Sequence, residues 1–217
     1  MLNIENVTYR YINSESDALK NVSANFEEGK IYSIVGPSGS GKTTLLSIMA
    51  GMDVPTTGTV SLAGDDLSNM DLDQYRRESI AMIFQAFQLL PLLTAIENVC
   101  IPMQMSGICR RDAQLKAKRL LEAVGINDAK HRRFPANLSG GEQQRVAIAR
   151  ALASGARVIL ADEPTGNLDA DNGDKIISIL KKLAHEDGYC VIVVTHNLEI
   201  AEESDIVYRM SDGVLHS

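Results

Sequence analysis

A glycine-rich segment with one lysine and two threonines carries the most specific chemistry in the sequence. It consists of Gly36, Pro37, Ser38, Gly39, Ser40, Gly41, Lys42, Thr43 and Thr44. We expect Gly36, Gly39 and Gly41 to adopt backbone angles that other residues avoid, so that successive N–H groups face one concavity. The pattern G-x-x-x-x-G-K-T predicts a nucleoside triphosphate site, with Lys42 at the β- and γ-phosphates and Thr43 on Mg²⁺.

The elements around this segment support the same interpretation. An apolar run at 31–35 predicts a buried strand before the loop, and residues 44–50 predict a helix after it. Free amides and the dipole at a helix N-terminus both favour an anion. The alternative is a glycine turn that only caps the helix, which the Lys-Thr pair and the preceding strand disfavour.

Three other predicted strands end in polar residues. Asp162 and Glu163 follow the apolar run 158–161, His196 follows 191–194, and Gln85 follows 80–84. Ligands of open α/β sheets lie at the carboxyl ends of the strands. We therefore predict that Asp162 and Gln85 contact Mg²⁺, that Glu163 activates the attacking water, and that His196 reaches the γ-phosphate. The alternative for Glu163 is an exposed acidic turn before a proline.

A second glycine pair lies at the start of a predicted helix. Ser139 and Glu142 have the S-x-x-E spacing of a helix capping box, and Thr94 and Glu97 share it. Gly140 and Gly141 distinguish the first case, because glycines at a helix start expose amides that an anion can approach. Either the chain binds two anions, or this second site completes a nucleotide pocket on another copy.

Composition narrows the class of protein. The 217 residues include 21 Lys and Arg against 28 Asp and Glu, a net charge of −7, and without a basic stripe we expect no nucleic-acid partner. The odd number of cysteines, 3, suits a reducing cytosol. No run approaches the ~20 apolar residues of a membrane span, and no signal peptide is expected.

Strand and helix patterns alternate at both ends of the chain and bracket a helical stretch. Helices are expected at 94–105, 112–124 and 142–153, with breaks at Pro102, Gly107, Gly125 and Pro135. Strands are expected at 2–11, 24–28, 31–35, 59–62, 80–84, 158–161, 191–194 and 206–210. These patterns predict an α/β fold with an inserted helical subdomain.

Taken together, the motifs make the sequence resemble the ATP-binding subunit of an ABC transporter over essentially its whole length. The set comprises the phosphate loop 36–44, Gln85, the run 138–143 (Leu-Ser-Gly-Gly-Glu-Gln), the pair 162–163, the run 166–169 (Gly-Asn-Leu-Asp) and His196. The runs 84–91, 94–99 and 161–169 look most like one branch, which releases lipoproteins, exports macrolides or resists peptide antibiotics and pairs with FtsX-like permeases.

The resemblance implies a fold, cofactors and partners. It implies a single domain over 1–217 with a P-loop NTPase (RecA-like) core and antiparallel β subdomain at 1–85 and 156–217, and a helical subdomain at 86–155. The cofactors would be ATP and Mg²⁺. Two copies would dimerise head to tail, so that Ser139, Gly140, Gly141 and Glu142 of one close over the nucleotide of the other. Asp169 would lie between the copies, and Tyr11 would stack on adenine.

The same resemblance implies a permease partner and therefore a place in the cell. The protein would lie in the cytoplasm, on the inner face of the membrane, where the permease supplies the span and the segment 86–91 contacts it. One alternative is an ATP-gated regulator that transmits force without transport, as in cell-division relatives. Another is a soluble P-loop kinase or GTPase, which the missing N-K-x-D pattern disfavours.

Overall fold

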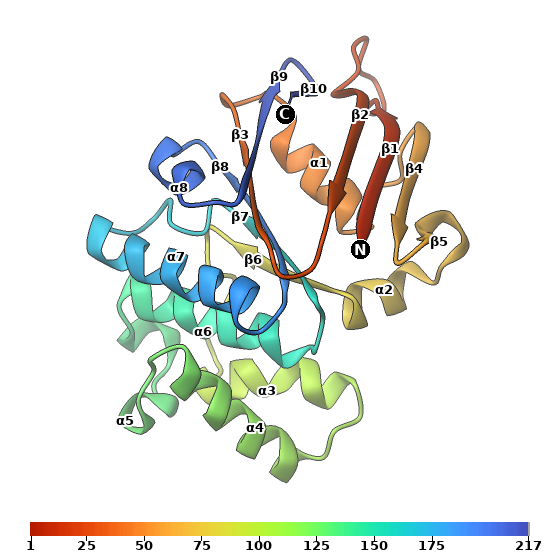
Figure 1. The fold of residues 1–217 in the computed structure, drawn as a ribbon. Coiled ribbons are helices and arrows are strands. Elements are labelled where there is room, and N and C mark those ends of the chain that lie inside the picture. Colours follow the sequence, from red (N-terminus) through yellow and green to blue (C-terminus); the bar gives the residue numbers. More distant parts are fainter. Residues whose placement is uncertain (217) are drawn as a thin grey trace.

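The computed structural model describes residues 1–216, which form two β-sheets and eight α-helices (Figure 1). The larger sheet has the order β10-β9-β3-β8-β7-β6. Its strands are β3 (Ile31–Val35), β6 (Ile80–Phe84), β7 (Val158–Asp162), β8 (Cys190–Thr195), β9 (Ile206–Ser211) and β10 (Val214–His216). All pairings are parallel except that of β10 with β9. The three central strands, β3, β8 and β7, consist almost entirely of buried residues, as expected for a parallel sheet covered on both faces.

The smaller sheet is antiparallel and has the order β2-β1-β4-β5. Its strands are β1 (Leu2–Tyr9), β2 (Leu19–Phe26), β4 (Thr57–Leu62) and β5 (Asp65–Asp66). Helix α1 (Lys42–Met49) lies between the two sheets (Figure 1). Its apolar residues are buried in the same cluster as those of β1 and β2. That cluster fixes the start of α1 against the end of β3.

The remaining helices lie on both faces of the larger sheet, and the first of them packs in the same apolar cluster as α1. They are α2 (Leu72–Glu78), α3 (Ala95–Met105), α4 (Arg110–Ala123), α5 (Asp128–His131), α6 (Gly140–Ala153), α7 (Ala170–His185) and α8 (Leu198–Glu202), with short 3₁₀ turns at η1 (Leu67–Asn69) and η2 (Pro135–Asn137). Helices α6 and α7 pack on the larger sheet, and α3, α4 and α5 lie beyond α6 (Figure 1).

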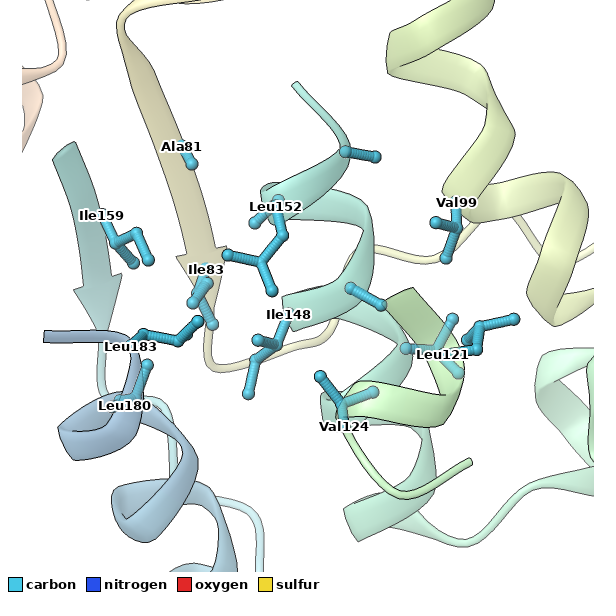
Figure 2. Close-up of a cluster of buried hydrophobic side chains, with 14 of the residues drawn as sticks. Ala81, Ile83, Val99, Leu121, Val124, Ile148, Leu152, Ile159, Leu180 and Leu183 are labelled. Carbon is cyan, nitrogen blue, oxygen red and sulfur yellow. The ribbon is translucent and has the colours of Figure 1, made fainter. Parts of the chain in front are cut away.

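Helix α6 joins the sheet to the outer helices through one apolar cluster. Figure 2 shows Ile148 and Leu152 of α6 between Ile83 of β6 and the side chains Val99 and Leu121 of α3 and α4. All of these residues are buried. Because one core runs through both groups of helices, the division into a core and a helical subdomain at 86–155 stays a prediction.

Most expected elements are present, but the expected break at Pro102 and the bounds of several elements need correction. Pro102 lies inside α3 and does not break it, although the ring removes a backbone N–H from the helix. The strand expected at 24–28 begins at Leu19 and ends at Phe26, and α4 begins two residues before the expected Asp112. Among residues 1–216, no helix combines the length and the apolar character needed to cross a membrane.

Candidate active site

The carboxyl ends of four parallel strands meet along one edge of the larger sheet. The register pairs Phe84 with Asp162, Asp162 with Val194, and Val35 with Thr195. A cavity of about 750 Å³ opens at this edge. Its lining consists of Tyr11, Ala18, Ser38, Gly39, Gly41, Lys42, Thr43, Thr44, Asp162, Glu163, Val194 and His196. The structure thus brings the glycine loop together with the acidic pair and His196.

The glycines of the loop are required for two different reasons. Gly39 and Gly41 have φ values of 80° and 106°, as the sequence predicts. Gly36 does not adopt a positive φ, and this expectation is corrected. A Cβ at Gly36 would lie 2.1 Å from the carbonyl oxygen of Met210, so glycine is needed there because β9 packs against the loop.

The N-terminus of α1 faces the cavity with free backbone amides. Its N-cap is Gly41, which supplies no capping side chain. The mostly buried Lys42 donates from Nζ to the carbonyl oxygens of Gly36 at 2.8 Å and Pro37 at 2.9 Å. These bonds hold the ammonium group across the loop, beside the amides. The combination of a cation and a helix N-terminus makes this end of the cavity an anion site.

Tyr11 also lines the cavity. Its hydroxyl lies 2.8 Å from Oγ1 of Thr44, and its ring packs edge-on against Tyr9 with a centroid distance of 4.9 Å. Tyr9 in turn donates to Asp53 at 3.2 Å. Tyr11 is 47% exposed as a residue, so part of its side chain is accessible to a ligand.

Asp162, Glu163 and His196 line the same cavity. Nδ1 of His196 lies 2.8 Å from Oε1 of Glu163, and because an ionised carboxylate only accepts, Nδ1 is the donor. Thr195 donates to the second carboxylate oxygen of Glu163 at 3.2 Å. The backbone of Glu163 has a φ of 47°, a strained value for this residue type, and its N–H donates to the Val194 carbonyl at 2.9 Å. Glu163 is thereby fixed at the cavity edge.

Asp162 carries an unfavourable charge in this setting. Burial raises its pKa above the ordinary value, and the neighbouring Glu163 carboxylate raises it further. The Lys42 ammonium opposes both effects but does not cancel them. A carboxylate with a raised pKa favours a proton or a cation, which is the electrostatic setting of a divalent-metal ligand.

Gln85 does not line the cavity. Its side-chain Nε2 donates to Oδ1 of Asn167 at 3.3 Å, and Asn167 returns a bond to the Gln85 carbonyl at 2.9 Å. A Cβ on Gly166 would lie 2.7 Å from Gln85 Nε2. The predicted contact of Gln85 with a metal therefore needs a movement of this side chain from Asn167 toward Thr43.

The side chains of Arg150 and Asn98 hold the backbone of the segment after Gln85. The sequence does not reveal this role of either residue. Phe87 and Gln88 have φ values of 57° and 52°, and Arg150 donates to both of their carbonyl groups. Buried Asn98 accepts from the Leu90 N–H at 2.8 Å. It donates to the carbonyls of Leu90, Leu93 and Thr94 at 3.2, 3.0 and 3.1 Å.

Asn98→Ala is expected to lower the free energy of unfolding by about 2 kcal/mol, because the part-buried Leu90 N–H and Leu93 carbonyl lose their partner. Gln104→Ala, on the exposed face of the same helix, is the control and should change stability by less than about 0.5 kcal/mol. Urea unfolding of both variants checks this. Equal midpoints for the two variants would show that water replaces the Asn98 bonds.

Ser139, Gly140, Gly141, Glu142 and Asp169 lie outside the cavity lining. The capping box is present: Glu142 Oε2 accepts from the Ser139 N–H at 2.9 Å, and Ser139 Oγ accepts from the Glu142 N–H at 3.3 Å. A Cβ on Gly141 would lie 2.7 Å from Asn172 of α7. Asp169 caps α7 by accepting from the Asn172 N–H at 2.9 Å. The two predicted phosphate sites are therefore separate within one chain.

Comparison with known proteins gives a consistent result. The family model described as ABC transporter matches residues 19–166. An uncharacterized ABC transporter ATP-binding protein of Thermotoga maritima is 50% identical over 200 residues, which cover 91% of this chain and 85% of that protein. The lipoprotein-releasing system ATP-binding protein LolD of Shewanella frigidimarina is 44% identical and covers 99% of this chain and 92% of that protein.

A solved structure agrees over the whole chain. The dimeric ATP-binding cassette MJ0796, in a post-hydrolysis state bound to ADP and Pi, superposes with a TM-score of 0.89 at 41% identity and covers 100% of this chain and 97% of that one. The predicted P-loop NTPase fold is confirmed. So is the prediction of an ATPase most similar to the lipoprotein-release branch. The chain belongs to the ABC transporter family, as an ATP-binding subunit.

Proposed function

We propose that this protein hydrolyses ATP in a head-to-tail dimer and thereby drives a permease that releases lipoproteins, exports macrolides or confers resistance to peptide antibiotics. The observation that carries the proposal is the separation of the two anion sites. Lys42 lines the large cavity, whereas Ser139 lies exposed at the start of α6 and outside that cavity. One chain alone therefore contacts a triphosphate on one side only.

ATP fits the cavity from end to end. The amides of the glycine loop and Lys42 bind the β- and γ-phosphates, and the ring of Tyr11 stacks on adenine. Mg²⁺ suits the hydroxyl of Thr43 and the carboxylate of Asp162, because both lie in the cavity and burial leaves the Asp162 charge uncompensated. This ion needs few protein ligands, since phosphate oxygens and water complete its octahedron.

Hydrolysis uses Glu163 and His196 at the edge of the cavity. Glu163 accepts hydrogen bonds from Thr195 and His196, which keep its carboxylate in one place. The carboxylate orients a water toward the γ-phosphorus and takes its proton as the P–O bond to ADP breaks. His196 is 69% exposed on its side chain, so its ring has room to turn and direct an N–H toward the γ-phosphate. Gln85 would provide a further oxygen ligand for Mg²⁺ once its side chain leaves Asn167.

A second copy supplies the missing side of the nucleotide. Gly140 and Gly141 leave the amides at the N-terminus of α6 unobstructed, and these amides favour a γ-phosphate held by Lys42 of the other copy. Asp169 lies at the adjoining end of α7, beside the same corner. The related MJ0796 cassette is a dimer, which supports this arrangement.

The surface after Gln85 is the proposed contact with an FtsX-like permease. Leu92 and Leu90 are 87% and 47% exposed, although both are apolar. Arg150 and Asn98 fix the backbone that carries them. A movement of Gln85 toward Mg²⁺ would pull on this rigid segment, and so connect nucleotide state to the permease. The protein then acts on the inner face of the membrane, where the permease supplies the span.

Ser139→Arg tests the shared site. It is expected to leave ATP binding to the isolated chain unchanged and to abolish ATP-dependent dimerisation, because the arginine fills the space of the incoming nucleotide. Ser106→Arg, at an exposed position on the C-cap of α3, is the control. Analytical ultracentrifugation with and without ATP measures the association. Cooperative turnover by the Ser139→Arg variant would contradict the proposal.

A further inference from the structure

Glu142 brings a negative charge to the helix end that the proposed function assigns to the partner's phosphate. Its carboxylate is bonded to the Ser139 N–H, and its own N–H is bonded to Ser139 Oγ. The acid therefore belongs to the corner that must receive the anion. A negative charge in this place repels a γ-phosphate and counteracts the favourable field of the α6 N-terminus.

Lys130 compensates this charge. Its ammonium group forms an ion pair and hydrogen bond with Oε1 of Glu142, so the two carboxylate oxygens have different partners. The pair is partly shielded from solvent, with side-chain exposures of 30% for Lys130 and 13% for Glu142. Solvent and salt screen such a pair less than an exposed one. The bond from Lys130 is also the main reason that the pKa of Glu142 lies below its ordinary value.

The position of Lys130 is set by a separate anchor. Lys130 lies on the short helix α5, and the next residue, His131, is buried and bonded through Nε2 to the Ile126 carbonyl at 2.9 Å. On the exposed side of α5, Asp128 is paired with Lys118 of α4 at 3.6 Å. The ammonium of Lys130 therefore faces Glu142 from a fixed backbone.

We propose that Lys130 is a positioning residue for ATP-driven closure: it neutralises Glu142 and holds that carboxylate on the Ser139 backbone, so that the α6 N-terminus accepts the partner's phosphate. The inference rests on the proposed dimer. It differs from a merely structural role, in which Lys130 ties α5 to α6. Loss of a tie cannot be repaired by neutralising Glu142, whereas loss of charge compensation can.

The experiment measures the ATP concentration at which half of the protein is dimeric, in a Glu163→Gln background that retains bound ATP. Lys130→Ala is expected to raise this concentration about tenfold. This factor lies between the effect of breaking an exposed charge pair and that of breaking a buried one. The Lys130→Ala, Glu142→Gln double variant should return to within about threefold of the parent. Lys116→Ala, at an exposed position on α4, is the matched control and should have no effect.

One further measurement and one further variant separate a failure of closure from a failure of ATP binding or folding. ATP binding to the dissociated chain should be the same in all variants, and Lys130→Met replaces Lys130→Ala if the alanine variant unfolds. Closure of the Lys130 variant at the parent's ATP concentration, or a double variant as impaired as the single one, would overturn the inference. If the Glu163→Gln background itself stays monomeric with ATP, the proposed function fails instead.

Discussion

Replacing Glu163 with glutamine is expected to lower the turnover number for ATP by about 10²–10⁴-fold, the usual contribution of a positioned general base. The amide keeps the shape of the side chain and can still bond to Thr195 and His196, so the cavity should keep its form. It cannot take a proton from water at neutral pH. ATP should therefore bind, close the dimer and remain uncleaved.

Phosphate release under steady-state conditions measures the loss, and size-exclusion chromatography with ATP measures the trapped dimer. Glu199→Gln is the matched control, because Glu199 is an exposed acid on the neighbouring helix α8 and lies outside the cavity lining. It should turn over ATP at the parent's rate. Unimpaired hydrolysis by the Glu163→Gln variant would remove Glu163 as the base and leave water activation to another group.

Local sequence patterns predict the strands that carry this chemistry because each is a short apolar run with a clear end. Ile31–Val35 and Ile80–Phe84 were expected with the bounds that the structure shows. Parallel strands place their carboxyl ends at one edge, so Asp162 and His196 could be assigned to a common site before any contact was known. Pro102 misled this approach, because the packing of α3 against α4 and α6 outweighs the local preference of proline.

Contacts between distant segments could not be predicted in the same way. Lys130 and Arg150 are long, ordinary surface-type residues in the sequence, and only the folded chain places one on Glu142 and the other under Phe87. Asn98 lies in the middle of a helix pattern, where a polar residue usually faces solvent. Its burial beneath the Leu90 segment depends on the path of that loop. Gln85 was assigned by its strand end alone, which does not reveal the competing bond to Asn167.

Asp162→Asn is expected to have opposite effects on activity and on stability. Activity should fall by about 10²-fold or more, because an amide is a weak replacement for a carboxylate that holds Mg²⁺. Stability without nucleotide should rise at pH 7, because the folded chain no longer contains a charge that burial and Glu163 make unfavourable. The same feature that suits Asp162 to a cation thus destabilises the empty site.

The pH dependence follows from the direction of the shift. The pKa of Asp162 is higher in the folded chain than in the unfolded one, so folding favours the protonated acid, and the stability of the parent falls as the pH rises through the folded pKa. The advantage of Asp162→Asn should therefore be full at neutral pH and should vanish below about pH 4, where the acid is protonated in both states. Thermal unfolding between these pH values, without Mg²⁺ or nucleotide, measures it.

Asp205 supplies a control, because its pKa is shifted in the direction opposite to that of Asp162. Burial raises its pKa, but the bonds from His185 at 2.9 Å and from the Ile31 N–H at 2.8 Å outweigh burial and hold the pKa below its ordinary value. Asp205→Asn should therefore lower the melting temperature at pH 7, while Asp162→Asn raises it. If both variants are destabilised alike, Asp162 has a partner for its charge in the empty protein, and the argument that its uncompensated carboxylate awaits a metal ion loses its basis.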